Sequence, residues 1–155
     1  MAQKTAWNAA ALTEADINLY LMGEGGAWTS WTPTVTQSGS VTVTNTRSRF
    51  ARYGRTIIAT FNLSVTGTGT ASNSVSVSLP VTAAASGIAS GTGALTDASA
   101  SITYLAVTWI GSTTAINLFG TSTDGAGVAL GSAIFTAALA SGDTLQATLV
   151  YEAAS

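Results

Sequence analysis

The stretch Thr56–Thr66, with the sequence TIIATFNLSVT, decides the fold class of this 155-residue chain. Apolar side chains occupy every second position, and polar side chains occupy most of the positions between them. The apolar set is Ile57, Ala59, Phe61, Leu63 and Val65, and the polar set is Thr60, Asn62, Ser64 and Thr66. Such alternation is typical of a β-strand with one face in a core and the other in water. The stretch therefore predicts a strand of an antiparallel sheet.

The rest of the chain from Trp28 onward shows similar segments. Alternation recurs around Val41 and Val43, from Val75 to Leu79 before Pro80, and from Thr144 to Glu152, and we expect one more strand within 126–140. Glycine-containing turns are predicted between the strands at Thr66–Gly69, Gly91–Gly93, Gly111–Ser112, Asp124–Gly127 and Ser141–Asp143. This spacing, without a helical pattern, predicts an all-β fold, an antiparallel β-sandwich or jelly-roll-like domain over residues 28–155.

The segment Ile102–Ile110 differs from the other predicted strands because it is apolar on both sides. Tyr104 and Ala106 share one face, and the opposite face carries Leu105, Val107 and Trp109. A strand of this kind is either central in a sheet or located at an interface.

An N-terminal anchor is predicted over residues 1–27. The segment Leu12–Gly23 is the helix candidate of the chain, with Thr13 and Asp16 at capping-box spacing. Ile17, Tyr20 and Leu21 share one helical face, which gives a narrow apolar stripe. About ten residues is marginal for an isolated helix, so we expect the stripe to dock on a partner or on another part of the protein.

The composition narrows the function classes. Charged residues make up only 8% of the chain, against about 25% in an average globular protein. The surface is therefore expected to be covered by Thr, Ser and Gly, or buried against other subunits. Cys and His are both absent, which removes thiol chemistry, the usual zinc sites and the familiar catalytic triads. We expect no enzyme activity, no cofactor and no membrane span, and the net charge of -2 argues against nucleic-acid binding.

The carboxylates are expected to cap turns rather than to catalyse. Asp97, Asp124 and Asp143 each lie beside small or polar residues in a predicted turn, where Asp hydrogen-bonds nearby backbone. A calcium site at Asp124 is the alternative, but the sequence around it lacks the spacing of a known calcium loop. We predict no metal site.

Four of the five cations lie within nine residues, interleaved with Phe50 and Tyr53. If this segment is a strand, Arg47, Arg49, Ala51 and Tyr53 share one face, while Ser48, Phe50, Arg52 and Gly54 share the other. We expect Arg47, Arg49, Arg52 and Arg55 to form intersubunit salt bridges; the alternative is a site for an anionic glycan, a nucleic-acid strand or a partner carboxylate.

Two tryptophans flank the start of the β domain. Trp28 and Trp31 could stack on sugar rings if they were exposed together. The competing interpretation, which we favour, is that they close one end of the fold or lie between subunits. Trp109 is expected in the core or at an interface.

Several short motifs resemble the β domains of minor structural proteins of tailed bacteriophages, above all phages that infect actinobacteria. The motifs are WTSWTPTVT at Trp28–Thr36, FARYGR at Phe50–Arg55, VSLPV at Val77–Val81, and the ending ASGDTL at Ala140–Leu145 with VYEAA at Val150–Ala154. Together they span most of residues 28–155, and they are turn and strand signatures rather than catalytic ones.

The resemblance implies a virion surface protein that forms a homotrimer and contacts other virion proteins through its N-terminal segment. It would serve as a capsid decoration protein or minor capsid protein, or as a tail-tip or fibre attachment protein. The alternative is a carbohydrate-binding adhesin module that recognises host cell-wall glycans. No secretory signal is predicted, so we expect assembly in the host cytoplasm and localisation in the virion.

Overall fold

The structure is a computed structural model that describes residues 28–120 and 137–154. These residues form ten β-strands joined by loops. The strands are β1 (Thr29–Ser30), β2 (Val35–Gln37), β3 (Gly39–Val41), β4 (Val43–Tyr53), β5 (Thr56–Val65), β6 (Val75–Ser78), β7 (Ala89–Asp97), β8 (Ile102–Ser112), β9 (Ala115–Gly120) and β10 (Thr144–Glu152). These residues include no helix, and so none that is long and apolar enough to cross a membrane. The all-β class is confirmed.

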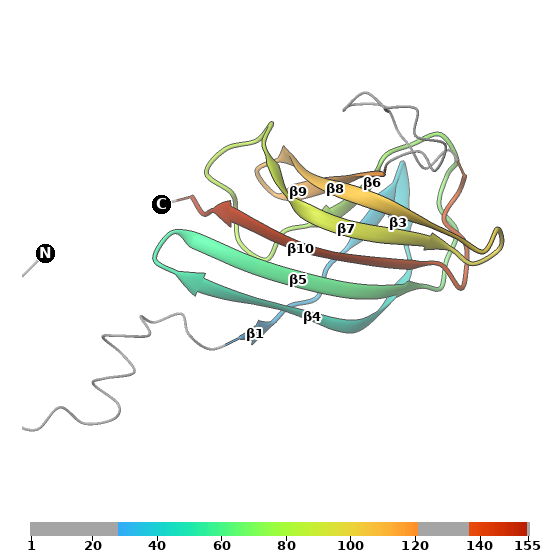
Figure 1. Ribbon diagram of the computed structural model, residues 1–155, viewed down its shortest axis with the longest axis horizontal. Helices are drawn as coiled ribbons and strands as arrows, with labels where there is room; N and C mark the ends of the chain where they lie inside the picture. The colour runs from blue at the N-terminus through green and yellow to red at the C-terminus, as the bar shows by residue number, and fades with distance from the viewer. Residues whose placement is uncertain (1–27, 121–136, 155) are drawn as a thin grey trace, which may run out of the picture.

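The strands form one antiparallel sheet in the order β1-β4-β5-β10-β7-β8-β9-β6-β2-β3. The sheet curls, so that β4, β5, β10 and β7 form a broad layer with β2 and β3 behind it (Figure 1). Strand β10, the last in the chain, lies between β5 and β7 and pairs with both. The C-terminal strand therefore lies in the middle of the sheet, beside strands from much earlier in the chain.

The two ends of the strand order are joined at Thr42. Strand β3 is at one end of the order and β4 is next to the other end, yet only Thr42 separates them in sequence. The Thr42 carbonyl accepts hydrogen bonds from the amides of Thr66 and Gly67, at 2.9 and 3.0 Å. The chain therefore turns a corner here, and this corner brings the two ends of the sheet around one core.

The alternation in the sequence corresponds to the inward face of this sheet. Along β5, Ile57, Ala59, Phe61, Leu63 and Val65 are each at most 1% exposed. They share a core with inward residues from the opposite end of the strand order, including Val35 on β2 and Val77 on β6. The predicted strands at residues 56–66, 75–79, 102–110 and 144–152 are confirmed, as are their inward and outward faces.

The prediction of a turn at Gly91–Gly93 is wrong, because both glycines lie inside β7. A Cβ atom at Gly91 would collide with the Thr148 carbonyl oxygen, and one at Gly93 would collide with the Gln146 carbonyl oxygen. The glycines therefore allow close approach of β7 to β10, which is a second common role of glycine in strands.

A buried amide fastens the segment 137–139 to the sheet. The Gln37 side chain is fully buried, and its Nε2 donates to the carbonyls of Asn73 and Ala137, at 3.2 and 3.0 Å. Its Oε1 accepts from the Leu139 amide at 2.9 Å. One side chain thus satisfies backbone groups from two loops that are far apart in sequence.

Two of the predicted turn carboxylates have the expected role. Asp143 accepts hydrogen bonds from the amides of Ala98 and Ala140, at 2.9 and 2.8 Å. Asp97 accepts from the Ser99 hydroxyl and the Ala100 amide, at 2.7 and 3.0 Å. The Ser99 bond, followed by the Ala100 bond, holds the pKa of Asp97 below its ordinary value.

Some predictions fall on residues that the structure does not describe. The helix at Leu12–Gly23, with Ile17, Tyr20 and Leu21, lies outside the described residues, as do Asp124 and residues 126–136 of the additional strand. Residues 137–140 are described and are not part of a strand.

Candidate ligand-binding face

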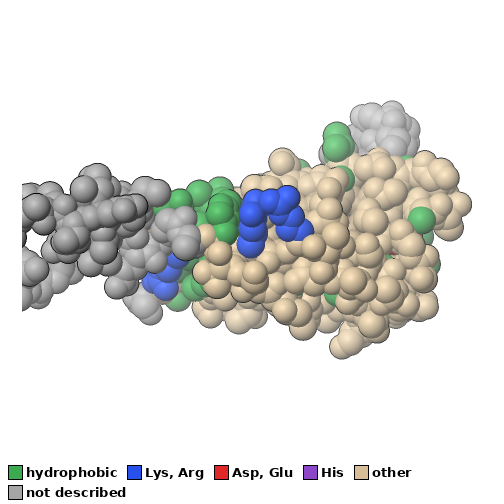
Figure 2. All heavy atoms as spheres, turned by 90° about the horizontal axis from the view of Figure 1, so that it is seen from below, with side chains coloured by type: hydrophobic (Ala, Val, Ile, Leu, Met, Phe, Trp, Pro, Cys, Tyr) green, Lys and Arg blue, Asp and Glu red, His purple; other side chains and the backbone are tan. Residues whose placement is uncertain are grey.

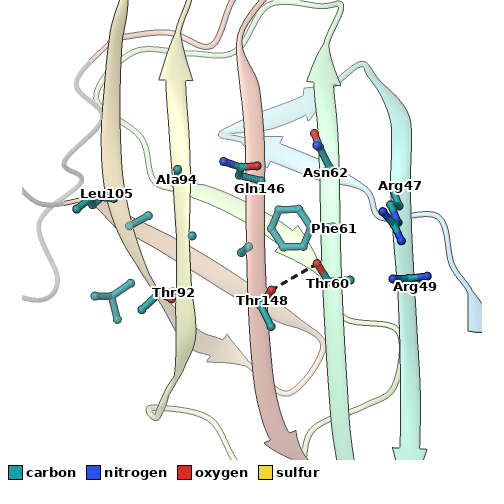
Figure 3. Close-up of a pocket in the computed structure, with 14 residues that line it drawn as sticks. Arg47, Arg49, Thr60, Phe61, Asn62, Thr92, Ala94, Leu105, Gln146 and Thr148 are labelled. Carbon is teal, nitrogen blue, oxygen red and sulfur yellow. Dashed lines mark hydrogen bonds between the residues drawn. The ribbon is translucent and has the colours of Figure 1, made fainter. Parts of the chain in front are cut away.

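The outward residues of β4, β5, β10, β7 and β8 form one continuous face, because each strand pairs with the next. The register aligns them in rows that cross all of these strands. The first row is Arg47, Asn62, Gln146, Ala94 and Leu105. Figure 3 shows Arg47 on β4 at one end of this row and Leu105 on β8 at the other, with two amide side chains between them.

The second row runs parallel to the first and is rich in hydroxyl groups. It consists of Arg49, Thr60, Thr148, Thr92 and Val107. The hydroxyls of Thr60 and Thr148 are hydrogen-bonded across the strands at 3.5 Å (Figure 3). Both rows therefore change from a guanidinium at β4, through uncharged polar groups, to an aliphatic side chain at β8.

A shallow hollow of about 780 Å³ lies over these two rows. Four of the residues that line its middle have no side chain larger than a methyl group: Gly93, Ala94, Ala106 and Ala147. Longer side chains stand at its margins, Arg47 and Arg49 on one side and Leu105 on the other. Ala94 is the short side chain of the outward row, between Gln146 and Leu105, whereas Ala106 and Ala147 belong to the core on the inward face. The hollow is a depression open to solvent rather than an enclosed cavity.

The arginine end of the hollow has no carboxylate partner among the described residues. The ion pair found there joins Arg55 to Glu152 at 3.2 Å, outside the hollow. The other described carboxylates, Asp97 and Asp143, are buried in their turns. The positive charges of Arg47 and Arg49 are therefore not neutralised within residues 28–120 and 137–154.

Arg49 is held in place by Trp28. The guanidinium carbon lies 4.7 Å from the centroid of the Trp28 ring, a cation–π distance. The Arg49 Nε is buried and has no hydrogen-bond partner, while 46% of Trp28 is exposed. The contact restricts the guanidinium of Arg49 at the margin of the hollow without using its hydrogen-bonding groups.

The predicted split of the arginines between two faces is confirmed by the register of β4. Arg47, Arg49 and Tyr53 are on the outward side, whereas Arg52 is on the other side and donates from Nε to the Gly54 carbonyl at 2.8 Å. Arg55 lies in the turn before β5 and pairs with Glu152 of its own chain. Figure 2 shows Lys and Arg atoms in two separate areas of a mostly uncharged surface.

The two tryptophans do not form a shared stacking platform. Trp31 packs against the core, with its ring at 6.5 Å and 81° to that of Phe61, an edge-to-face contact. Trp28 instead contacts Arg49 and is exposed. The core position of Trp31 agrees with the interpretation that it closes one end of the fold.

An uncharged apolar area adjoins the hollow on the same outward face. Val150 is 50% exposed and is paired with Ile58, while Trp109 is paired with Ala89 at the same end of the neighbouring strands. We call Ile58, Ala89, Trp109 and Val150 the apolar patch. None of these four residues lines the hollow, so the two features are adjacent but distinct.

The sequence interpretation missed the amide and hydroxyl groups of the hollow. Asn62 and Thr60 were recognised as the wet face of one strand, and Gln146 and Thr148 as that of another. What the sequence does not contain is the pairing of β5 with β10, which sets these side chains opposite each other.

Comparisons of the chain with protein-family models, with curated proteins and with solved structures gave no match. In the described ranges, no three His, Cys, Asp or Glu side chains are grouped in a way that could hold a metal ion.

Proposed function

We propose that this chain is a non-enzymatic structural protein of a bacteriophage particle. It forms a homotrimer on the virion surface and is mounted on other virion proteins, in the capsid or at the tail tip, through residues 1–27. In this proposal the curled sheet is a β-sandwich of the jelly-roll type, since both ends of its strand order enclose one core.

The apolar patch is the observation that carries this proposal. Val150 is 50% exposed and its cross-strand partner Ile58 is half-buried, as is Trp109 on the same face, two strands away on β8. Contiguous apolar surface of this kind marks contact sites, and the cores of interfaces are depleted in charge. The low share of charged residues, 8% overall, supports a subunit within an assembly.

Light scattering on the full chain tests this proposal. We expect a mass near three times the 15.5 kDa of one chain, and a mass near that of the monomer for Val150→Asp, because a buried unpaired carboxylate is costly. Thr148→Asp is the matched control, since it adds the same charge on the same face of β10 but outside the patch. A monomeric wild type, or a trimer unaffected by Val150→Asp, would contradict the proposal.

A second candidate function, a carbohydrate-binding adhesin module, is favoured by the hollow. Asn62 and Gln146 lie opposite each other and are exposed, and their side chains form no hydrogen bond with another described residue. Amide side chains both donate and accept, which suits sugar hydroxyls. The two candidates are compatible, because the patch and the hollow do not share residues.

Binding of the full chain to immobilised bacterial glycans tests the adhesin candidate. Ala94→Phe would place a large ring in the middle of the hollow without changing charge, and we expect it to abolish glycan binding. Ser76→Phe, on β6 outside the hollow, is the control for a large added ring. Glycan binding that survives Ala94→Phe would exclude the hollow as the site.

A further inference from the structure

We propose that the arginine end of the hollow binds the acidic group, a carboxylate or a phosphate, of an anionic glycan. This inference deepens the adhesin candidate and rests on the glycan-binding role proposed above. It goes beyond that role by naming the class of sugar and the residues that select it.

The two arginines of the hollow are spaced so that both can bind one anionic group. Arg47 and Arg49 are two residues apart on the same side of β4, so their Cα atoms are separated by about 7 Å. Both line the hollow, and Figure 3 shows both at its β4 margin. Guanidinium groups bind carboxylates and phosphates with parallel hydrogen bonds, so a pair at this spacing suits one anionic group between them.

Arg47 and Arg49 have no carboxylate partner among the described residues. Within residues 28–120 and 137–154, the three carboxylates are all engaged: Asp97 and Asp143 with backbone amides, and Glu152 with Arg55. A second copy would therefore offer no free carboxylate from its own described surface. Within the described ranges, the charges of Arg47 and Arg49 are therefore left to interact with an anionic ligand.

The contact with Trp28 orders the Arg49 side chain for binding. With its guanidinium carbon 4.7 Å from the Trp28 ring centroid, Arg49 is restricted before a ligand arrives. Restricting a long side chain in advance lowers the entropy cost of binding.

The neighbouring side chains favour a sugar over other anions. Next to the arginines along the rows lie Asn62, Gln146 and Thr148, which are uncharged and can donate and accept hydrogen bonds. A nucleic-acid strand would require many phosphate contacts, whereas only Arg47 and Arg49 provide cations in the hollow. One acidic group next to several hydroxyls is the pattern of an acidic saccharide.

The test is a binding measurement of the full chain on an array that contains neutral, carboxylated and phosphorylated bacterial glycans. We expect signals only from the acidic glycans, and the carboxylated and phosphorylated sets show which anion is recognised. Since a hydrogen bond to a charged group contributes about 1.5–3 kcal/mol, Arg47→Gln and Arg49→Gln should each weaken binding by about tenfold or more.

Arg52→Gln is the matched control. It removes the same charge from the same strand, but Arg52 is on the opposite side and outside the hollow, so we expect unchanged affinity. An oligothymidine probe tests general attraction to anions, and binding to it as strong as to the acidic glycans would overturn the inference. So would equal effects of Arg52→Gln and Arg47→Gln.

Failure of this inference is distinguishable from failure of the adhesin candidate. Binding of neutral glycans that Ala94→Phe abolishes and Arg47→Gln leaves unchanged would keep the adhesin role and refute the acidic ligand. No binding to any glycan on the array would refute both.

Discussion

Replacing Gln37 by leucine should test how much one buried amide contributes to this fold. The substitution conserves size but removes three hydrogen bonds, to the carbonyls of Asn73 and Ala137 and from the amide of Leu139. These bonds attach two distant loops to β2, so their loss should reduce the free energy of unfolding of the whole domain.

The magnitude follows from the burial of each partner. Leu139 is 0% exposed, and leaving its buried amide without an acceptor costs about 1–3 kcal/mol. Ala137 is exposed and Asn73 is half-buried, so their carbonyls can recover water and add about 1 kcal/mol in total. The greater hydrophobicity of leucine offsets part of this loss, which leaves about 2–3 kcal/mol of a total of about 5–15 kcal/mol.

Urea unfolding followed by tryptophan fluorescence measures this loss directly. Gln146→Leu is the matched control, because the Gln146 side chain is exposed and forms no hydrogen bond with another described residue. We expect it to change the free energy of unfolding by less than about 0.5 kcal/mol. If Gln37→Leu were as neutral as Gln146→Leu, the proposed role of the buried amide would be wrong.

Three further substitutions test other parts of the fold by the same measurement. For Asp97→Asn we expect a smaller loss of stability on acidification than for the wild type. The pKa of Asp97 is lowered in the folded state, so the wild-type carboxylate stabilises the fold above pH 3.8, and this contribution disappears as the pH falls through and below that value. An acid profile that is the same for both proteins would contradict this. Tyr151→Phe removes the hydrogen bonds of the hydroxyl to the Val81 backbone, at 2.8 and 3.3 Å, and should cost about 1–2 kcal/mol. Because burial raises the pKa of Tyr151 to about 12 from 10.0, the wild type should also lose stability as pH rises from 10 toward 12, and the variant should lose less. Gly91→Ala places a Cβ against the Thr148 carbonyl oxygen and should cost about 1–3 kcal/mol, whereas a neutral effect would show that β7 and β10 can separate freely.

Alternation in the sequence was sufficient to predict β5, β6, β8 and β10 but not their neighbours. The predicted strand at Thr144–Glu152 has the bounds of β10, because a strand with one buried face repeats every second residue. Its position between β5 and β7 depends on contacts across most of the chain. The rows of the candidate site are a product of that pairing, so they could not be predicted from any single strand.

The tryptophans show a signal that the sequence did contain. Trp28 and Trp31 are three positions apart, and in an extended chain residues an odd number of positions apart point to opposite sides. The structure shows the exposed Trp28 on Arg49 and Trp31 against Phe61. This spacing by itself predicts that the two rings do not form a shared stacking platform. In the same way, the spacing of Arg47, Arg49 and Arg52 correctly predicted that they lie on two faces of β4.

Glycines inside a strand were the least predictable feature. Gly91 and Gly93 have the composition of a turn, and only the approach of the β10 backbone explains their position within β7. Ala94 likewise contributes to the hollow only once β10, β7 and β8 lie side by side.

The reactivity of one introduced thiol tests most directly whether the outward face is an interaction surface. The chain contains no cysteine, so Val150→Cys introduces a unique thiol in the apolar patch, and Thr36→Cys introduces one at an exposed position on β2. The rate of modification by a maleimide is measured for the native and the urea-unfolded forms of each variant. We predict that the native form protects Cys at position 150 much more strongly than Cys at position 36, because a second copy covers the patch. Equal reactivity of the two thiols in the native protein would contradict self-association through this face.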